Sequence, residues 1–167
     1  MQLISPTKKY EQSWREALLE LETEGTGGFW NIPEKPADIE EYIERTRNHS
    51  KGINIPDYWA PATTYWLIDE GRFVGHVNIR HSLNEKLEKK GGHVGYTIRS
   101  SARRNGYGMK ILELALLKAR EIGLKKVLVT CDDKNIASIK IVEKNGGILQ
   151  DKIEVEGMLV RRYWIEN

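Results

Sequence analysis

Residues 95–109 read Gly-Tyr-Thr-Ile-Arg-Ser-Ser-Ala-Arg-Arg-Asn-Gly-Tyr-Gly-Met, and this stretch decides the fold. Its first five residues predict the end of a strand, a polar turn follows, and a helix is expected from Gly106. Gly106 and Gly108 have no side chain, so a ligand can approach the main chain closely there. The first turn of a helix also carries unpaired N–H groups and a partial positive charge. With Arg103 and Arg104 at its mouth, this turn is predicted to bind a phosphate or pyrophosphate.

The segment after this turn alternates between helices and strands. Residues 106–123 and 135–145 have helical spacing of apolar side chains, and residues 126–131 form a short apolar run typical of a strand buried on both faces. Residues 148–155 and 158–165 predict a final pair of strands around a Glu-Gly turn. The predicted buried side of the first helix consists of Ile111, Leu112, Ala115, Leu116 and Ala119. Along the second helix, four residues are in register: Ile136, Ile139, Val142 and Glu143.

The segment before the turn has a period of two. Residues 63–69, 72–80 and 93–99 predict three strands with short links, which form an antiparallel meander, and residues 84–90 predict a loop or a short exposed helix. Joined to the alternating second half, this pattern predicts an α/β (α+β) fold with a mixed, mostly antiparallel sheet and helices on both faces. We expect a single domain over residues 1–167.

The N-terminal part predicts two helices. A short strand is expected at residues 2–4 and a helix at residues 8–22, which Thr7 caps and a glycine cluster ends. A second helix begins at Asp38 and places four side chains on one face: Ile39, Tyr42, Ile43 and Thr46. Residues 29–36 predict a loop. The irregular segment 50–61 carries Tyr58 and Trp59, for which we favour packing over lining a pocket.

Composition excludes several classes of protein. The chain has 167 residues, of which 40% are hydrophobic and 30% charged, as in soluble globular proteins. A net charge of +2 argues against a dedicated nucleic-acid binder. The single cysteine, Cys131, rules out an internal disulfide, and paired Cys/His ligands at zinc spacing are absent. No apolar run reaches the roughly 18 residues of a membrane span, and the N-terminus lacks a signal-peptide pattern. We therefore expect a cytoplasmic protein without a metal, a membrane partner or a nucleic-acid partner.

Two other nucleotide-binding motifs use similar glycines and are alternative interpretations of this turn. A P-loop needs Gly-Lys-Ser/Thr, whereas Gly108 is followed by Met-Lys. A dinucleotide fingerprint needs a third glycine where Ile111 stands, and it begins directly at the end of its strand. Asp132 and Asp133 lie roughly 20 residues downstream, where a ribose-binding acid would sit. A dinucleotide-dependent enzyme thus remains an alternative. It ranks behind a protein of another family that binds an anion at this turn.

Two segments resemble the GNAT superfamily of N-acetyltransferases. Residues 103–108, Arg-Arg-Asn-Gly-Tyr-Gly, match its Arg/Gln-x-x-Gly-x-Gly/Ala signature, and Asn-Ile-Ala-Ser-Ile at 135–139, followed by Glu-Lys-Asn-Gly at 143–146, resembles its second conserved block. The likeness covers residues 73–149. It implies acetyl-CoA as donor, splayed central strands, and direct attack by a primary amine in a ternary complex. That amine would belong to a small molecule, a peptide N-terminus or a lysine. A monomer and a homodimer both fit this resemblance.

Carried over by position, the resemblance implies a set of coenzyme A contacts. The strand residues Ile98 and Arg99 would run beside the pantetheine arm. Asn135 would hydrogen-bond the pantetheine amide, although capping its own helix is an alternative role, and Ser138 would lie near the cofactor. Main-chain amides would hold the pyrophosphate from Arg103, Arg104, Gly106, Gly108 and Met109, with Asn105 and Tyr107 alongside.

The catalytic groups depart from the family pattern. Many members have a tyrosine acid where this chain has Val142, which cannot donate a proton. Tyr96 shares a strand face with Ile98 and is the candidate proton donor for the leaving thiolate, and a main-chain N–H near Ile98 would stabilise the oxyanion. His76 is a candidate base acting through water. Cys131 lacks an activating partner and is interpreted as cavity wall.

Two further expectations follow from the same pattern. The N-terminal helices and the segment 50–61 are expected to form the acceptor pocket, because the cofactor would occupy the other side of the sheet. The missing tyrosine at Val142 also leaves open an acyl-CoA-binding regulator without turnover on the same fold.

Overall fold

The computed structural model describes residues 1–24 and 38–167, so the glycines expected to end the first helix and the loop expected at 29–36 lie outside the described residues. The strands are β1 (Gln2–Ile4), β2 (Ala62–Asp69), β3 (Arg72–Arg80), β4 (Val94–Ile98), β5 (Lys126–Asp132), β6 (Ile148–Val155) and β7 (Met158–Glu166). The helices are α1 (Glu11–Thr23), α2 (Ile39–Ser50), α3 (Glu85–Lys89), α4 (Tyr107–Glu121) and α5 (Ile136–Lys144), with short 3-10 turns at Lys8–Tyr10 and Ser100–Ala102.

The strands form two hydrogen-bonded groups. One has the order β1-β2-β3-β4 and the other β5-β7-β6, and every neighbouring pair is antiparallel. The two groups meet just before β4, where the His93 N–H donates to the Leu128 carbonyl at 2.7 Å and the Leu128 N–H donates to His93 Nδ1 at 2.9 Å. Past this point β4 and β5 share no hydrogen bond among the described residues. The central strands are therefore splayed, as the family resemblance implies.

Gly92 permits this close approach of the two strand groups. Its φ is +60°, and a Cβ there would stand 2.4 Å from the Leu128 carbonyl oxygen. A side chain at this position would push β5 away from the start of β4, since a carbon atom cannot approach an oxygen so closely. The closed end of the wedge between β4 and β5 thus depends on a residue without a side chain.

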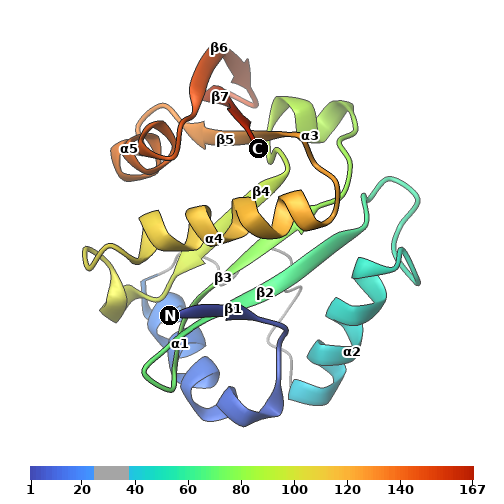
Figure 1. Ribbon diagram of the computed structural model, residues 1–167, viewed down its shortest axis with the longest axis vertical. Helices are drawn as coiled ribbons and strands as arrows, with labels where there is room; N and C mark the ends of the chain where they lie inside the picture. Colours follow the sequence, from blue (N-terminus) through green and yellow to red (C-terminus); the bar gives the residue numbers. More distant parts are fainter. Residues whose placement is uncertain (25–37) are drawn as a thin grey trace.

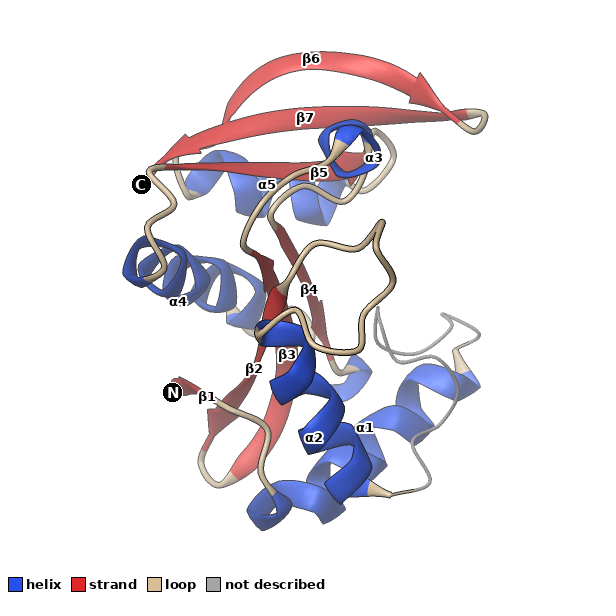
Figure 2. Cartoon of the chain, turned by 90° about the vertical axis from the view of Figure 1, so that its right-hand side faces the viewer, coloured by secondary structure: helices blue, strands red, loops and turns tan. Residues whose placement is uncertain are grey.

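Helices cover the β1–β4 group on both faces (Figures 1 and 2). α4 lies on one face, whereas α1 and α2 lie on the other. The α4 side is filled by aliphatic residues that include Val77, Ile111 and Val142. On the α1 and α2 side the rings of Trp14 and Trp66 stack, with centroids 5.6 Å apart. No helix within residues 1–24 and 38–167 is long and apolar enough to cross a membrane.

The sequence predicted most boundaries to within one or two residues, with a few differences. The predicted helix at 8–22 begins as a 3-10 turn, with the Thr7 hydroxyl capping it. The segment 84–90 forms the exposed helix α3, capped by Asn84. Ile136 is in register with the buried Ile139 and Val142, but it lies in the first turn of α5 and is 54% exposed. Leu116 is half-buried rather than buried.

Candidate functional site

The turn before α4 presents a row of free main-chain N–H groups. Arg104 has φ +65° and Gly106 has φ +80°, so the chain twice adopts the left-handed conformation. Within the described chain, the N–H groups of residues 104–108 donate to no protein acceptor. Successive N–H groups at such a turn converge on an anion, and the helix N-terminus adds partial positive charge. We call residues 104–108 the anion turn.

Two of the amides expected to hold the pyrophosphate have internal partners. The Arg103 N–H donates to the Ser100 carbonyl at 3.2 Å and the Met109 N–H to the Gly106 carbonyl at 3.1 Å. Asn105 shapes the turn instead through its side chain, whose Nδ2 donates to the Arg103 carbonyl at 3.1 Å. The amides left free are those of the anion turn.

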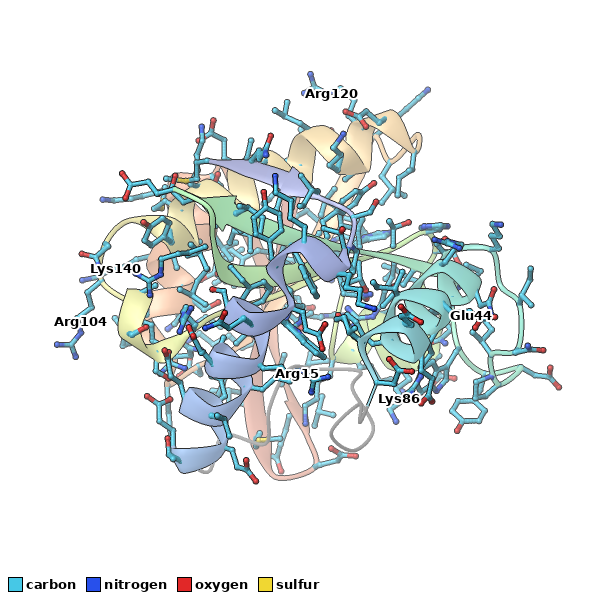
Figure 3. All side chains as sticks on the ribbon, turned by 90° about the horizontal axis from the view of Figure 1, so that it is seen from below. Arg15, Glu44, Lys86, Arg104, Arg120 and Lys140 are labelled. Carbon is cyan, nitrogen blue, oxygen red and sulfur yellow. The ribbon has the colours of Figure 1, made fainter. Side chains whose placement is uncertain are left out.

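The remaining side chains of the turn fasten it to its surroundings. Arg103 Nη1 donates to Glu24 at 2.8 Å, and the Tyr107 hydroxyl donates to Asp69 at 2.9 Å, which lowers the pKa of Asp69. Arg104 is exposed (Figure 3). A Cβ at Gly108 would stand 2.5 Å from Ile141 Cδ1, so this glycine also lets α5 pack closely on α4.

A cavity of about 310 Å³ lies between β4 and β5, and we call it the wedge cavity. Residues 94–96 of β4 and 129–132 of β5 line it, together with Arg80, Asn135 and Ser138. Because the wedge is closed where β4 begins, it opens at the carboxyl end of β4, where the anion turn follows. An elongated ligand with a phosphate at one end could therefore lie along both.

The main chain of β4 offers donors to this wedge. The Arg99 N–H donates to the Val74 carbonyl at 2.9 Å, on the β3 side. Antiparallel pairing alternates the direction of main-chain groups, so those of Ile98 and Tyr96 point away from β3 and toward the wedge. The Ile98 N–H is thus placed where an oxyanion hole was expected.

Tyr96 and Ser138 meet in the wedge cavity. Their hydroxyl oxygens are 3.2 Å apart. Burial raises the pKa of Tyr96 to about 12, so its hydroxyl keeps its proton at neutral pH. Asn135 caps α5, with its side-chain oxygen accepting from the Ser138 N–H at 3.0 Å, and its amide NH₂ group makes no hydrogen bond within the described part of the chain. The cap and a cofactor contact are compatible.

Arg99 turns its side chain away from the wedge. Its guanidinium is 3% exposed and donates from Nε and Nη2 to Glu20 of α1, and from Nη1 to the Phe73 carbonyl at 3.1 Å. Burial opposes ionisation of Glu20, but hydrogen bonds from Arg99 and Ser101 outweigh it and lower the pKa of Glu20 to about 2. The main-chain groups of Arg99 also have partners, because its N–H donates to the Val74 carbonyl and its carbonyl accepts from the Ala102 N–H at 3.0 Å.

A second cavity, of about 380 Å³, lies on the other face of the sheet. α2, residues 53–56, Trp59, Thr64 and His76 line it, and we call it the α2 cavity. Of the walls expected for the acceptor pocket, α2 and the segment 50–61 line this cavity, whereas α1 contributes no lining residue. The preference for packing of the two aromatic residues was wrong: Trp59 lines this cavity beside the His49 ring, and Tyr58 is 71% exposed, because the segment 51–61 crosses the surface.

His76 lies at the floor of the α2 cavity with 3% of its surface exposed. Burial lowers the pKa of His76 to about 3, so its imidazole is neutral at neutral pH. A group with so low a pKa removes protons poorly, since the best general bases have a pKa near the working pH. His76 is therefore better suited to contact an acceptor than to deprotonate it.

Comparison with known proteins decides the family. The family model described as "Acetyltransferase (GNAT) domain" matches residues 10–148, which is most of the chain. The chain belongs to the GNAT acetyltransferase family. A search of curated proteins gives no match for this sequence.

Solved structures share the GNAT fold at low sequence identity. The microcin C7 self-immunity acetyltransferase MccE, in complex with acetyl-CoA and AMP, is 14% identical with a TM-score of 0.70, over 99% of this chain and 91% of that one. The ribosomal-protein-alanine N-acetyltransferase from Brucella melitensis is 15% identical with a TM-score of 0.67, over 100% of both chains. The ribosomal L7/L12 acetyltransferase RimL, in complex with coenzyme A, is 14% identical with a TM-score of 0.68, over 98% and 92%.

Other residues of this GNAT domain have structural roles. Val142 stands at the family's usual tyrosine position. It has no hydroxyl and is fully buried in the core. Cys131 lines the wedge cavity, and burial raises the pKa of its thiol to about 11, consistent with a wall. Asp133, which the dinucleotide alternative would use to bind a ribose, pairs with Arg161 and Lys152. No cluster of three metal-binding side chains occurs in the described residues.

Sequence reasoning missed Arg80. This side chain lines the wedge cavity from β3 and is only 8% exposed. The available signal was the period of two, which places Arg80 on the same face of β3 as His76 and Asn78. A charged residue on a buried strand face is unusual enough to indicate a function.

Proposed function

We propose that this GNAT domain is an N-acetyltransferase that moves an acetyl group from acetyl-CoA to a primary amine by direct attack in a ternary complex. The observation that carries this proposal is the anion turn, whose five N–H groups have no acceptor among the described residues and which follows β4, a wall of the wedge cavity. Such a row suits a pyrophosphate. Two structurally similar proteins are described in complex with coenzyme A or acetyl-CoA, which supports the same ligand here.

The residues present fit coenzyme A along its length. The anion turn would hold the pyrophosphate, with Arg103 fixing the turn and Met109 continuing into α4. The main chain of Ile98 and Arg99 would flank the pantetheine arm, and the free NH₂ group of Asn135 would donate to one of its amide carbonyls. Ser138 would lie beside its thiol end. The bound thioester supplies an activated acetyl group.

Proton movements fall to the chain's own residues. The Ile98 N–H would donate to the carbonyl oxygen as negative charge develops there. Tyr96 would donate its proton to the leaving sulfur, since its hydroxyl is protonated and lies in the wedge cavity. The α2 cavity would admit the amine from the opposite face. A water, rather than His76, would take the amine proton, because burial keeps the pKa of His76 low.

Reversing the charge of Arg104 tests the anion turn. We expect Arg104→Glu to weaken coenzyme A binding about tenfold, because a carboxylate would stand beside the pyrophosphate. Arg120→Glu is the matched control, since Arg120 is exposed at the other end of α4 and Figure 3 shows the two side chains well apart. The measurement is isothermal titration with coenzyme A.

Pantetheine sharpens this experiment because it lacks the pyrophosphate. With S-acetylpantetheine as donor, the Arg104→Glu and wild-type proteins should transfer acetyl groups with equal kcat/KM. Unchanged coenzyme A affinity in Arg104→Glu, or an equal loss with both donors, would contradict the assignment of the turn.

A regulator that binds acyl-CoA without turnover is the second candidate, because Val142 removes the usual proton donor. Release of free thiol from acetyl-CoA in the presence of a panel of amines separates the two. Binding of acetyl-CoA without acceptor-dependent thiol release would favour the regulator, whereas acetylation of any panel member favours the enzyme.

A further inference from the structure

Arg80 is a buried cation that has no carboxylate partner in the described part of the chain. Its side chain is 8% exposed, and within residues 1–24 and 38–167 no acidic group forms an ion pair with it. Its side-chain hydrogen bonds to the described residues run from Nη1 to the carbonyl oxygens of Gly91, at 2.9 Å, and Gly92, at 3.0 Å. Taking a charge out of water is costly unless a partner compensates it. These two carbonyls compensate only one end of the guanidinium.

The edge left free is the one that binds carboxylates. A guanidinium has five N–H donors, and Nη1 uses both of its own on the two glycine carbonyls. The Nε–Nη2 edge therefore has no acceptor among the described residues. This edge matches the two oxygens of a carboxylate, with which it forms a bidentate pair.

Three other poorly exposed arginines of this chain use the same edge on an acid. Arg99 donates from Nε and Nη2 to Glu20, and Arg162 donates from Nε and Nη2 to the two oxygens of Asp151. Arg161 donates from Nε to Asp133. Arg80 is more buried than Arg161 or Arg162, yet its corresponding edge meets no acid among the described residues.

The guanidinium of Arg80 lies in the wedge cavity beside β4. Arg80 lines the wedge cavity, and its Nη1 and Nη2 lie 3.8 and 3.9 Å from where a Cβ of Gly95 would stand, directly against β4. Lys90 lines the same cavity and pairs with the exposed Glu156 at 3.2 Å. Asp132 is the acid of this lining, and its Oδ1 accepts from the Lys134 N–H at 2.7 Å.

We propose that the Nε–Nη2 edge of Arg80 binds the carboxylate of the acceptor, so that the acceptor is a free amino acid rather than a peptide N-terminus or a protein lysine. This inference rests on the transferase activity proposed above. In an α-amino acid, the amine and the carboxylate share one carbon. A carboxylate held by Arg80 therefore keeps the amine inside the wedge cavity, which Tyr96 also lines.

The two cavities lie along the same face of β3. His76, Asn78 and Arg80 alternate on this face, with His76 lining the α2 cavity and Arg80 the wedge cavity. Asn78 lies between them, 2% exposed, and its side-chain NH₂ donates to Thr64 at 3.1 Å. The amino-acid side chain would extend along β3 toward the α2 cavity, whose aromatic and polar walls would select it.

The decisive comparison is between amino acids and their amides. The probes are alanine, serine, leucine, phenylalanine, glutamate and lysine, each as the free acid and as the α-carboxamide, with thiol release from acetyl-CoA as the readout. We expect the best free acid to exceed its amide in kcat/KM by at least about thirtyfold, because the amide leaves the buried guanidinium unpaired. Equal rates for acids and amides would overturn the inference.

Arg80 variants connect this preference to the guanidinium. Arg80→Met should reduce kcat/KM for the free acid to about that of the amide, while leaving the amide rate and the KM for acetyl-CoA within about threefold of wild type. Arg80→Lys, which keeps the charge but loses the fork, should retain part of the preference. Arg120→Met is the matched control and should keep all of it. Thermal unfolding establishes that each variant is folded.

A binding measurement separates failure of this inference from failure of the transferase proposal. By ligand-observed NMR in the presence of coenzyme A, N-acetylalanine should bind the wild-type protein and lose affinity in Arg80→Met, whereas N-acetylalaninamide should bind both alike. If coenzyme A binds and peptides or amides are acetylated as well as amino acids, the acceptor inference is wrong and the transferase stands. If coenzyme A does not bind, both fail. A preference for acids that persists in folded Arg80→Met also refutes the role of Arg80.

Discussion

Replacing Tyr96 by phenylalanine is expected to lower kcat for acetyl transfer about 100-fold while leaving the KM for acetyl-CoA unchanged. The hydroxyl lies in the wedge cavity, 3.2 Å from Ser138 Oγ, and burial raises the pKa of Tyr96 to about 12. A group with this pKa is protonated throughout the neutral range, so it has a proton to donate, but it is a weaker acid than an ordinary tyrosine. Steady-state thiol release at saturating acetyl-CoA measures the effect.

A matched variant tests whether the hydroxyl itself matters. Tyr65→Phe removes the hydroxyl of a half-buried tyrosine on β2, which is separated from β4 by β3 and lies outside the wedge cavity, and should leave kcat unchanged. Ser138→Ala removes the hydrogen-bonding partner of Tyr96 and should reduce kcat less than Tyr96→Phe does. The wild-type pH profile should show no loss of kcat from deprotonation of Tyr96 until the pH approaches 12. Turnover by Tyr96→Phe equal to that of Tyr65→Phe would remove Tyr96 from the mechanism.

The parts of the fold that are local in sequence could be predicted, and those that depend on distant partners could not. The strand at 72–80 follows from its period of two, and the anion turn follows from glycines at 106 and 108 beside two arginines. The splay between β4 and β5 was predicted only from the family resemblance. The two strands are held together at one end by the contact of Gly92 with Leu128, and no local sequence pattern reveals a contact between residues so far apart in the chain.

Charged residues show the same limit. The sequence places Arg99 beside a ligand, but its guanidinium turns to Glu20, which is 79 positions away in the chain. Arg80 was not predicted as a site residue because the sequence of β3 does not show whether an acidic side chain pairs with the Nε–Nη2 edge of its guanidinium. A periodic pattern gives the face of a strand on which a side chain lies, whereas the partner of a charge depends on which helix covers that face.

The pairing of Arg99 with Glu20 leads to the largest expected loss of stability. Glu20→Ala should lower the free energy of unfolding by about 3 kcal/mol, because it leaves a guanidinium that is 3% exposed without its counter-ion. The same carboxylate accepts from the Ser101 N–H at 3.0 Å, so its loss also loosens the 3-10 turn that leads into the anion turn. Urea unfolding at pH 7 measures the change, and coenzyme A affinity should fall with it.

The control and the pH dependence separate this pair from ordinary surface charge. Glu16 lies on the same helix, 3.8 Å from Arg99 and 52% exposed, so Glu16→Ala should cost less than about 1 kcal/mol. The pKa of Glu20 is lowered from 4.5 to about 2 in the folded protein, so its stabilisation is complete above pH 4.5 and is lost as the pH falls toward 2. The deficit of Glu20→Ala relative to wild type should therefore be constant above pH 5 and narrow below pH 4.5. A deficit that is equally large at pH 3 would show that the loss comes from packing and not from the charge of Glu20.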